Sequence, residues 1–268
     1  MKQCDLGVLD GPVLIFGGPY SNLQATQAVL DKAAKQGIAP SNVICTGDVV
    51  AYCGQPVETI DAIRSFGCAV VAGNCEKQLA AYEDNCGCGF EVGTTCDLLS
   101  AGWYAHASAT VGDEDRQWMA ELPDLIRFSH QGQQMAVIHG GVRDVSRFVW
   151  PSDAHTVFNE EISEIQKVVP QTSCVFAGHS GSPFQRDIEN IRWVNAGVVG
   201  MPSHDGTPDT RYVVLHDDEV TIHTLSYDKD AAQAAMQAVG LRQGYDRALV
   251  TGYWPSEDVL PEALRARG

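Results

Sequence analysis

Short apolar runs alternate with amphipathic stretches along residues 1–71. Residues 12–16, 42–45 and 69–71 are apolar and have the length of buried strands. Between them, leucine and alanine recur at helical spacing over 21–37, and residues 56–66 begin with a proline, which suits the first turn of a helix. This alternation of strand and helix predicts a parallel sheet covered by helices.

The alternation breaks between about residues 77 and 130. Two helical patterns, near 94–105 and 113–121, follow a loop rich in cysteine and glycine, and they predict a helical cap or insertion. Apolar strand patterns resume at 135–138, 174–176, 192–194, 212–216 and 219–224.

The last two of these strands flank Asp217-Asp218, a favourable hairpin turn. An amphipathic helix is expected over 230–239, within a C-terminal region that starts at about residue 228. We expect the tail from 244 to 268 to pack loosely.

Composition narrows the class of protein. The net charge of −16 over 268 residues disfavours non-specific binding to nucleic acid, because the surface repels phosphate backbones. No apolar run reaches the roughly 20 residues that span a bilayer, and residues 1–10 lack the pattern of a signal peptide. Nine scattered cysteines do not suit a secreted disulfide scaffold. We therefore expect a single cytoplasmic domain, and a homo-oligomer is compatible with the sequence.

Four polar residues follow predicted strands directly: Asp48, Asn74, His139 and His179. The carboxyl ends of strands meet at one edge of an α/β sheet, so these side chains are expected to converge there. Two oxygen and two nitrogen donors suit Mn, Fe, Zn or Ni. The sequence therefore predicts a metal site formed by these four residues.

The order Gly-Asp, Gly-Asn, His-Gly, Gly-His resembles the metal-ligand series of the calcineurin-like metallophosphoesterases. The chain is similar to compact bacterial members of the diadenosine-tetraphosphatase-like type, and residues 21–25 and 194–202 also resemble family segments. The resemblance implies an α/β fold, a four-layer sandwich of two mixed β-sheets flanked by helices. It also implies a metal-dependent hydrolase acting on a small phosphorylated or anionic substrate, such as a phosphomonoester, a phosphodiester or a nucleotide.

Family members hold two metals bridged by an aspartate, and the resemblance assigns the bridge to Asp48. Asn74, His139 and His179 would complete the second-metal site. The first-metal site departs from the family, because its Asp-x-His falls on residues 18–20, Gly-Pro-Tyr, and its last His falls on Gly181. We therefore expect one metal rather than two.

Three residues are candidates for catalysis: Cys75, His139 and Arg143. Cys75 stands where the family has a histidine, and a thiol beside a cation can become a ligand or a nucleophile; the alternative is a small buried thiol. Arg143 follows the His139 strand and could hold a substrate phosphate or carboxylate; the alternative is a loop network with Asp144.

Further candidates lie around this set. Tyr20 and His204 could rebuild the first site or contact substrate, and Asn22 is a further candidate contact; otherwise these residues line the pocket. Phe148, Trp150 and His155 form either an aromatic wall or part of the core.

A group of cysteines falls within a short span of the sequence, and three of the four lie in the expected insertion. Its members are Cys75, Cys86, Cys88 and Cys96. Their spacing is compatible with a structural zinc, a redox pair or free thiols.

Two functional alternatives follow from the departures of this sequence from the family's ligand pattern. One is a catalytically silent binding or regulatory protein, and the other is a repurposed enzyme that uses Cys75 and one metal.

Overall fold

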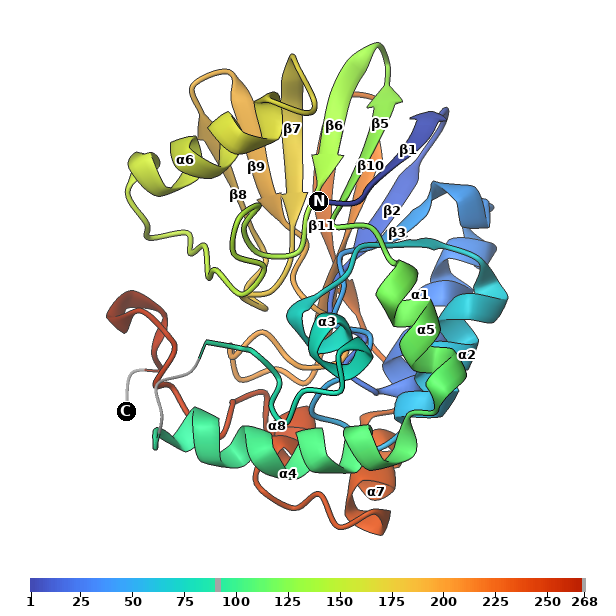
Figure 1. Ribbon diagram of the computed structural model, residues 1–268, viewed down its shortest axis with the longest axis vertical. Coiled ribbons are helices and arrows are strands. Elements are labelled where there is room, and N and C mark those ends of the chain that lie inside the picture. The colour runs from blue at the N-terminus through green and yellow to red at the C-terminus, as the bar shows by residue number, and fades with distance from the viewer. Residues whose placement is uncertain (90–92, 267–268) are drawn as a thin grey trace.

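Two β-sheets pack face to face, and helices cover their outer sides (Figure 1). The computed structural model describes residues 1–89 and 93–266. The six-stranded sheet has the order β1 (Gln3–Val8), β5 (Leu125–His130), β6 (Gln133–Val137), β7 (Thr172–Ala177), β9 (Ile191–Asn195), β8 (Phe184–Ile188). The five-stranded sheet has the order β11 (Glu219–Leu225), β10 (Thr210–His216), β2 (Val13–Phe16), β3 (Val43–Cys45), β4 (Ala69–Val70).

Both sheets are mixed. Strands β2, β3 and β4 run parallel, as the alternating pattern of the first 71 residues predicts, whereas β10 is antiparallel to β2 and β11. In the other sheet β6, β7 and β9 are parallel to one another. Strand β5 is antiparallel to β6, and β8 is antiparallel to β9. The predicted four-layer sandwich is therefore confirmed.

Strand β2 shows why its sequence is a continuous apolar run. All four of its residues are buried, and successive side chains of a strand point to opposite faces. Leu14 and Phe16 join the core under the helices, whereas Val13 and Ile15 pack against the other sheet. A strand buried on both faces has no polar positions to alternate with.

The helices form the two outer layers and a group at one end of the sheets (Figure 1). Phe158, Ile162 and Ile165 of one helix, α6, pack on the outer face of the six-stranded sheet. The helices are α1 (Leu23–Lys35), α2 (Pro56–Phe66), α3 (Asn74–Ala80), α4 (Thr95–Thr110), α5 (Asp113–Glu121), α6 (His155–Gln166), α7 (Lys229–Ala238), α8 (Tyr245–Thr251), with single 3-10 turns at Pro40–Asn42 and Glu262–Leu264.

Two expectations about the segments need correction. The helical segment expected to about residue 130 ends with α5, because Leu125–His130 is a strand of the six-stranded sheet. The tail is not loosely packed, since Ala248 and Leu249 of α8 are fully buried and α8 packs on α7. Residues 90–92 of the expected insertion and 267–268 of the tail lie outside the described residues.

The hairpin predicted at Asp217-Asp218 is confirmed, because β10 ends at His216 and β11 begins at Glu219.

Among the helices in the described ranges, none combines the length and the apolar character needed to cross a membrane.

Candidate metal centre

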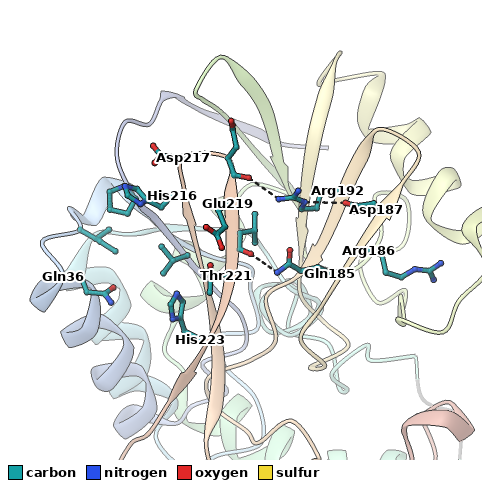
Figure 2. Close-up of a pocket in the computed structure, with 15 residues that line it drawn as sticks. Gln36, Gln185, Arg186, Asp187, Arg192, His216, Asp217, Glu219, Thr221 and His223 are labelled. Carbon is teal, nitrogen blue, oxygen red and sulfur yellow. Dashed lines mark hydrogen bonds and ion pairs between the residues drawn. The ribbon is translucent and has the colours of Figure 1, made fainter.

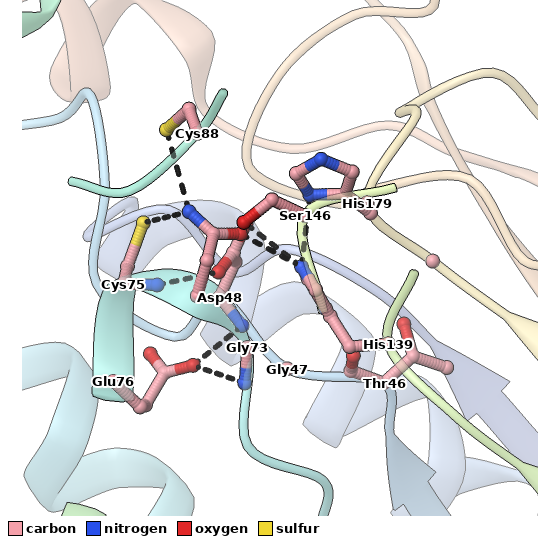
Figure 3. Close-up of polar contacts among 12 residues, drawn as sticks. Thr46, Gly47, Asp48, Gly73, Cys75, Glu76, Cys88, His139, Ser146 and His179 are labelled. Carbon is pink, nitrogen blue, oxygen red and sulfur yellow. Dashed lines mark hydrogen bonds and ion pairs between the residues drawn. The ribbon is translucent and has the colours of Figure 1, made fainter. Parts of the chain in front are cut away.

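The four predicted ligands come together at the carboxyl ends of their strands (Figure 3). Asp48 follows β3, His139 follows β6 and His179 follows β7, while Asn74 opens α3 just after β4. All four side chains are buried, with exposed fractions between 1% and 8%. Strand order alone therefore brings residues from four separate segments to one point.

Nε2 of His139 is at the centre of the group. It lies 3.3 Å from Oδ2 of Asp48, 3.2 Å from Oδ1 of Asn74 and 3.1 Å from Nδ1 of His179. One ligand atom from each of Asp48, His139 and His179 falls within 4.8 Å of the others. This is the separation expected of atoms that share one ion.

Two backbone carbonyls orient the ligands. Nδ1 of His139 donates to the carbonyl of Thr46 at 2.7 Å, which directs Nε2 into the site. Nδ2 of Asn74 donates to the carbonyl of Cys86 at 2.8 Å, which turns Oδ1 toward His139. A carbonyl only accepts hydrogen bonds, so both orientations are determined.

The charge states suit metal binding. Burial, together with neighbouring His139, lowers the pKa of His179 to about 3, so this imidazole is neutral at pH 7 and keeps a free lone pair. Burial opposes ionisation of Asp48, but the charge of protonated His139 and its hydrogen bond hold the pKa of the carboxyl below its usual value. Asp48 is therefore the anionic ligand of the set. Burial opposes the charge of His139 in turn, yet Asp48 raises the pKa of this imidazole, so a metal ion would replace the His139 proton when it binds.

The residues present fit a metal cofactor. Four electron-pair donors point to one place, and their mutual repulsion is relieved only by positive charge between them. A proton on Nε2 of His139 would satisfy one neighbour at a time, whereas a metal ion accepts all four donors. An Asp, Asn, His, His set is compatible with Mn, Fe, Zn or Ni.

Glu76 supports the site, and the sequence reasoning missed it. Its buried carboxylate accepts hydrogen bonds from the backbone N–H groups of Asp48 at 2.8 Å, Gly73 at 2.9 Å and Val50 at 3.2 Å. Burial and the nearby Asp48 raise the pKa of Glu76 to about 7. An acid three residues after Gly73, at the start of a helix, is the capping pattern that could have revealed it.

The family model for the calcineurin-like phosphoesterase superfamily domain matches residues 16–219. The chain belongs to this superfamily. The family and its dependence on metal, which the ligand series suggested, are thereby confirmed.

Known proteins resemble this chain in sequence or in fold. The chain is 22% identical over 239 residues to the uncharacterized protein MJ0912 of Methanocaldococcus jannaschii, covering 83% of this chain and 89% of that protein. The structure of hypothetical protein PH1004 from Pyrococcus horikoshii superposes with a TM-score of 0.71 at 17% identity, covering 91% and 99% of the two chains. The structure of a metallophosphoesterase from Sphaerobacter thermophilus superposes with a TM-score of 0.68 at 20% identity, covering 90% of this chain and 99% of that chain. These structures establish the architecture.

The two glycines that the family resemblance places at first-site ligand positions, Gly18 and Gly181, lie in crowded surroundings. A Cβ on Gly18 would lie 2.6 Å from the Val198 side chain and 2.7 Å from the Tyr20 ring. At Gly181, whose φ is +73°, a Cβ would lie 3.3 Å from the Trp254 ring. A side chain at Gly18 therefore requires Val198 or Tyr20 to shift, whereas one at Gly181 is opposed by the positive φ and by a tight contact with Trp254.

Cys75 is a buried thiol in the second layer of the site. Its backbone N–H donates to Oδ1 of Asp48 at 3.3 Å, and its Sγ lies 3.5 Å from Nδ2 of Asn74. Burial, reinforced by the negative charge of Asp48, raises the pKa of this thiol well above its usual value. This environment favours the buried-thiol alternative, and a catalytic Cys75 stays a prediction.

Arg143 lies on the surface, outside the ligand cluster. Its guanidinium contacts Glu164 at 2.7 Å, so the expected network with Asp144 is replaced by a pair with α6. The residue nevertheless lines a hollow of about 380 Å³ that also includes Lys77 and His139. Asp124 lines it too and pairs with Lys77, so both cationic side chains of the hollow already have acidic partners.

The structure does not bring Asn22 and His204 into the cluster. Asn22 caps α1 by accepting from Ala25 N–H, and its Nδ2 donates to the carbonyl of Gly200. His204 contacts Glu257 at 2.7 Å through Nε2 and accepts from the N–H of Trp254 at 2.8 Å through Nδ1. The polar atoms of both side chains form hydrogen bonds that stabilise the fold.

Tyr20 lines a small cavity beside the centre. The cavity has a volume of about 50 Å³ and is bordered also by Asp48, Phe148, His179 and Trp254. The Phe148 ring lies 4.3 Å from that of His179 and stacks on Trp150 at 5.4 Å, which gives the expected aromatic wall. His155 is exposed at the start of α6 and is not part of it.

The four cysteines of this group are in two different chemical states. Cys86 and Cys88 form a disulfide, whereas Cys75 and Cys96 are buried free thiols. In the described part of the chain, the group of side chains placed to hold a metal is Asp48, His139 and His179, without any cysteine. This arrangement favours the redox pair over a structural zinc.

A larger hollow, of about 950 Å³, lies away from this chemistry (Figure 2). It contains Pro12 before β2 and the turn of the β10–β11 hairpin, whereas the ligands follow the opposite ends of the strands. Its polar groups are partly engaged, since Gln185 donates to the carbonyl of Val220 and Arg192 to that of Asp218. No predicted site residue lines it.

Proposed function

We propose that this chain is a phosphoester hydrolase with a mononuclear metal centre formed by Asp48, Asn74, His139 and His179. The observation that supports this most strongly is the convergence of three ligand atoms on Nε2 of His139 within 3.1–3.3 Å. When bound, the ion would polarise a phosphoryl oxygen and lower the pKa of a bound water. Asp48 supplies the negative charge, and the Thr46 carbonyl fixes the His139 ring.

The proposed substrate is a small phosphorylated compound. Arg143 and Lys77 border the hollow of about 380 Å³ that His139 also lines, so a phosphate entering there would compete with Glu164 and Asp124 for these two cations. The cavity on the other side, of about 50 Å³, is much smaller than this hollow of about 380 Å³. Approach of the substrate from the side of Arg143 is part of the proposal. A cytoplasmic location is part of this proposal, as the acidic surface and reduced cysteines Cys75 and Cys96 suit it.

The test combines metal analysis with a substrate panel. Protein purified without chelator is expected to contain about one metal ion per chain, and to hydrolyse phosphomonoesters, phosphodiesters or nucleotides after addition of Mn, Fe, Zn or Ni. A chain that binds none of these ions and stays inert with each of them would contradict the proposal.

Asp48→Asn is the sharpest variant, because it removes the anionic ligand at constant size. We expect its metal affinity to fall by more than about a hundredfold, since outer partners of metal ligands alone contribute about 10–100-fold. Isothermal titration measures the loss, and Asp217→Asn in the exposed hairpin turn serves as the matched control. Equal affinity in the two variants would exclude Asp48 as a ligand.

A second candidate function is a catalytically silent binding protein with one metal. It is favoured by glycine at positions 18 and 181, because glycine supplies no ligand atom and the surroundings of both positions are crowded. Binding of a phosphorylated compound without turnover at saturating metal would support it. Ordinary turnover by the unmodified chain would exclude it.

A further inference from the structure

We propose that Cys86 and Cys88 are a reversible redox pair that controls the orientation of Asn74 and thereby the metal affinity of the centre. The inference rests on the proposed metal site and adds a thiol–disulfide site beside it. Its reaction partner is a small-molecule or protein dithiol.

The pair is buried in a loop whose flanking residues are exposed. Cys86 and Cys88 are 4% and 5% exposed, whereas residues 81–85 and Gly89 are exposed, so reduction requires this surface loop to open. A disulfide that closes a loop of only three residues constrains the unfolded chain less than one that closes a long loop. Its value for global stability is therefore small, which suits a regulatory rather than a structural bond.

The pair touches a metal ligand directly. Nδ2 of Asn74 donates to the carbonyl of Cys86 at 2.8 Å and lies 3.3 Å from Sγ of Cys88 (Figure 3). The same amide presents its oxygen to His139 at 3.2 Å. If the amide group turned over, an N–H group, which cannot bind a cation, would face the site. The position of the Cys86 carbonyl thus decides whether Asn74 acts as a ligand.

A second contact connects the loop to the other side of the centre. The hydroxyl of Ser146 donates to the carbonyl of Gly87, and Gly87 N–H donates to the Asn85 side chain at 2.9 Å. Cys88 also lines the cavity that Asp48 and His179 border. A rearrangement of residues 86–88 is therefore transmitted to the ligands from two directions.

The chemistry is a balanced exchange. A dithiol reduces the bond between Cys86 and Cys88, two electrons and two protons pass to the sulfurs, and the dithiol becomes a cyclic disulfide. Two thiols do not remain at bonding distance, and the proposed consequence is that the backbone of 86–88 relaxes and the Cys86 carbonyl leaves its position on Asn74. The oxidised form preorganises the ligand, and reduction weakens metal binding.

The experiment compares metal affinity in the two redox forms of the full chain. Protein is oxidised, or reduced with dithiothreitol and desalted without oxygen, and alkylation counts two additional thiols in the reduced sample. Isothermal titration with Zn or Mn then measures affinity, which we expect to fall about 10–100-fold on reduction, the range for loss of an outer partner of a ligand.

Two variants sharpen the comparison. Cys86→Ser is expected to have the affinity of the reduced chain under both conditions, while Cys4→Ser on β1 keeps the full response. Equal affinity of the oxidised and reduced chains would overturn the inference and leave the metal centre standing. Tighter binding after reduction would overturn it too, because the thiolates would then be ligands themselves. Binding in neither form would overturn the metal centre together with the inference.

Discussion

Gly181 stands where the family resemblance places a metal-binding histidine, and its surroundings bear on the expectation of one metal. The residue has φ = +73°, where side chains other than glycine are strained, and the Trp254 ring lies against its open side. Tyr20 and Val198 fill the space at Gly18 in the same way. The loss of the first site is thus a matter of packing as well as of missing ligands.

Gly181→His is therefore expected not to restore a second metal. The left-handed backbone costs about 1–2 kcal/mol of unfolding free energy, and crowding against Trp254 adds to it. Urea denaturation measures the stability, and metal analysis the stoichiometry. Gly132→His is the matched control, because its φ is +76° and a Cβ at this position would have no neighbouring atom within 4 Å. Two metals per chain in Gly181→His would show that space is not the limit.

At the scale of elements, the sequence reveals strands buried on both faces and misses those that are not. β2 is one apolar run, whereas β1 is largely exposed and has no such signal. β5 was missed because its buried residues alternate with Arg127 and Ser129, directly after the helical pattern of α5. Short α3 has only seven residues, too few for an apolar stripe.

In the candidate site, the sequence likewise predicts some residues and misses others. Asp48, Asn74, His139 and His179 were predicted because each joins a ligand-type side chain to a strand end. Their supports were not, because the carbonyls of Thr46 and Cys86 act through backbone atoms that carry no residue signature. The covering Trp254 comes from a segment far along the chain. Contacts of this kind depend on the assembled fold.

The link between α3 and β5 is electrostatic and should depend on pH. Asp124, just before β5, contacts Lys77 of α3 and accepts from the backbone N–H of Lys2. Burial opposes ionisation, but these two partners lower the pKa of Asp124 below its usual value. A lowered pKa stabilises the fold above the unfolded-state pKa of about 3.9, and the contribution disappears as the pH falls through the folded-state value.

Asp124→Asn is expected to lower the unfolding free energy by about 1 kcal/mol at pH 7. The value is small because the Asp124–Lys77 pair is partly exposed, and solvent screens its attraction. The difference from the unmodified chain should shrink as the pH drops below about 4, because the wild-type carboxyl is then protonated as well. Urea denaturation at pH 7 and pH 3 measures it. Asp187→Asn, in an exposed pair with Arg192, should have little effect at either pH. A difference that persists undiminished at pH 3 would contradict the assignment.

At the scale of the whole molecule, the C-terminal segment closes one side of the metal centre. Trp254 borders the cavity and is fixed by its indole N–H, which donates to the carbonyl of Pro202 at 2.7 Å, and by its backbone N–H, which donates to His204. Glu257 contacts His204, and Asp258 accepts from Thr95 N–H at the start of α4. Residues distant in sequence thus form a cover over ligands that they do not touch.

A cover of this kind should control the rate of metal exchange more than its equilibrium. Trp254→Ala removes the cover but no ligand, so a chelator is expected to extract the metal severalfold faster while the equilibrium affinity changes little. Stopped-flow mixing with a coloured chelator measures the rate, at a temperature well below unfolding. Trp118→Ala, which removes an indole beside Arg64 on α2, is the matched control and should leave the rate unchanged. An unchanged rate in Trp254→Ala would mean that the metal leaves through the hollow beside Arg143, and that both substrate and metal use that one entrance.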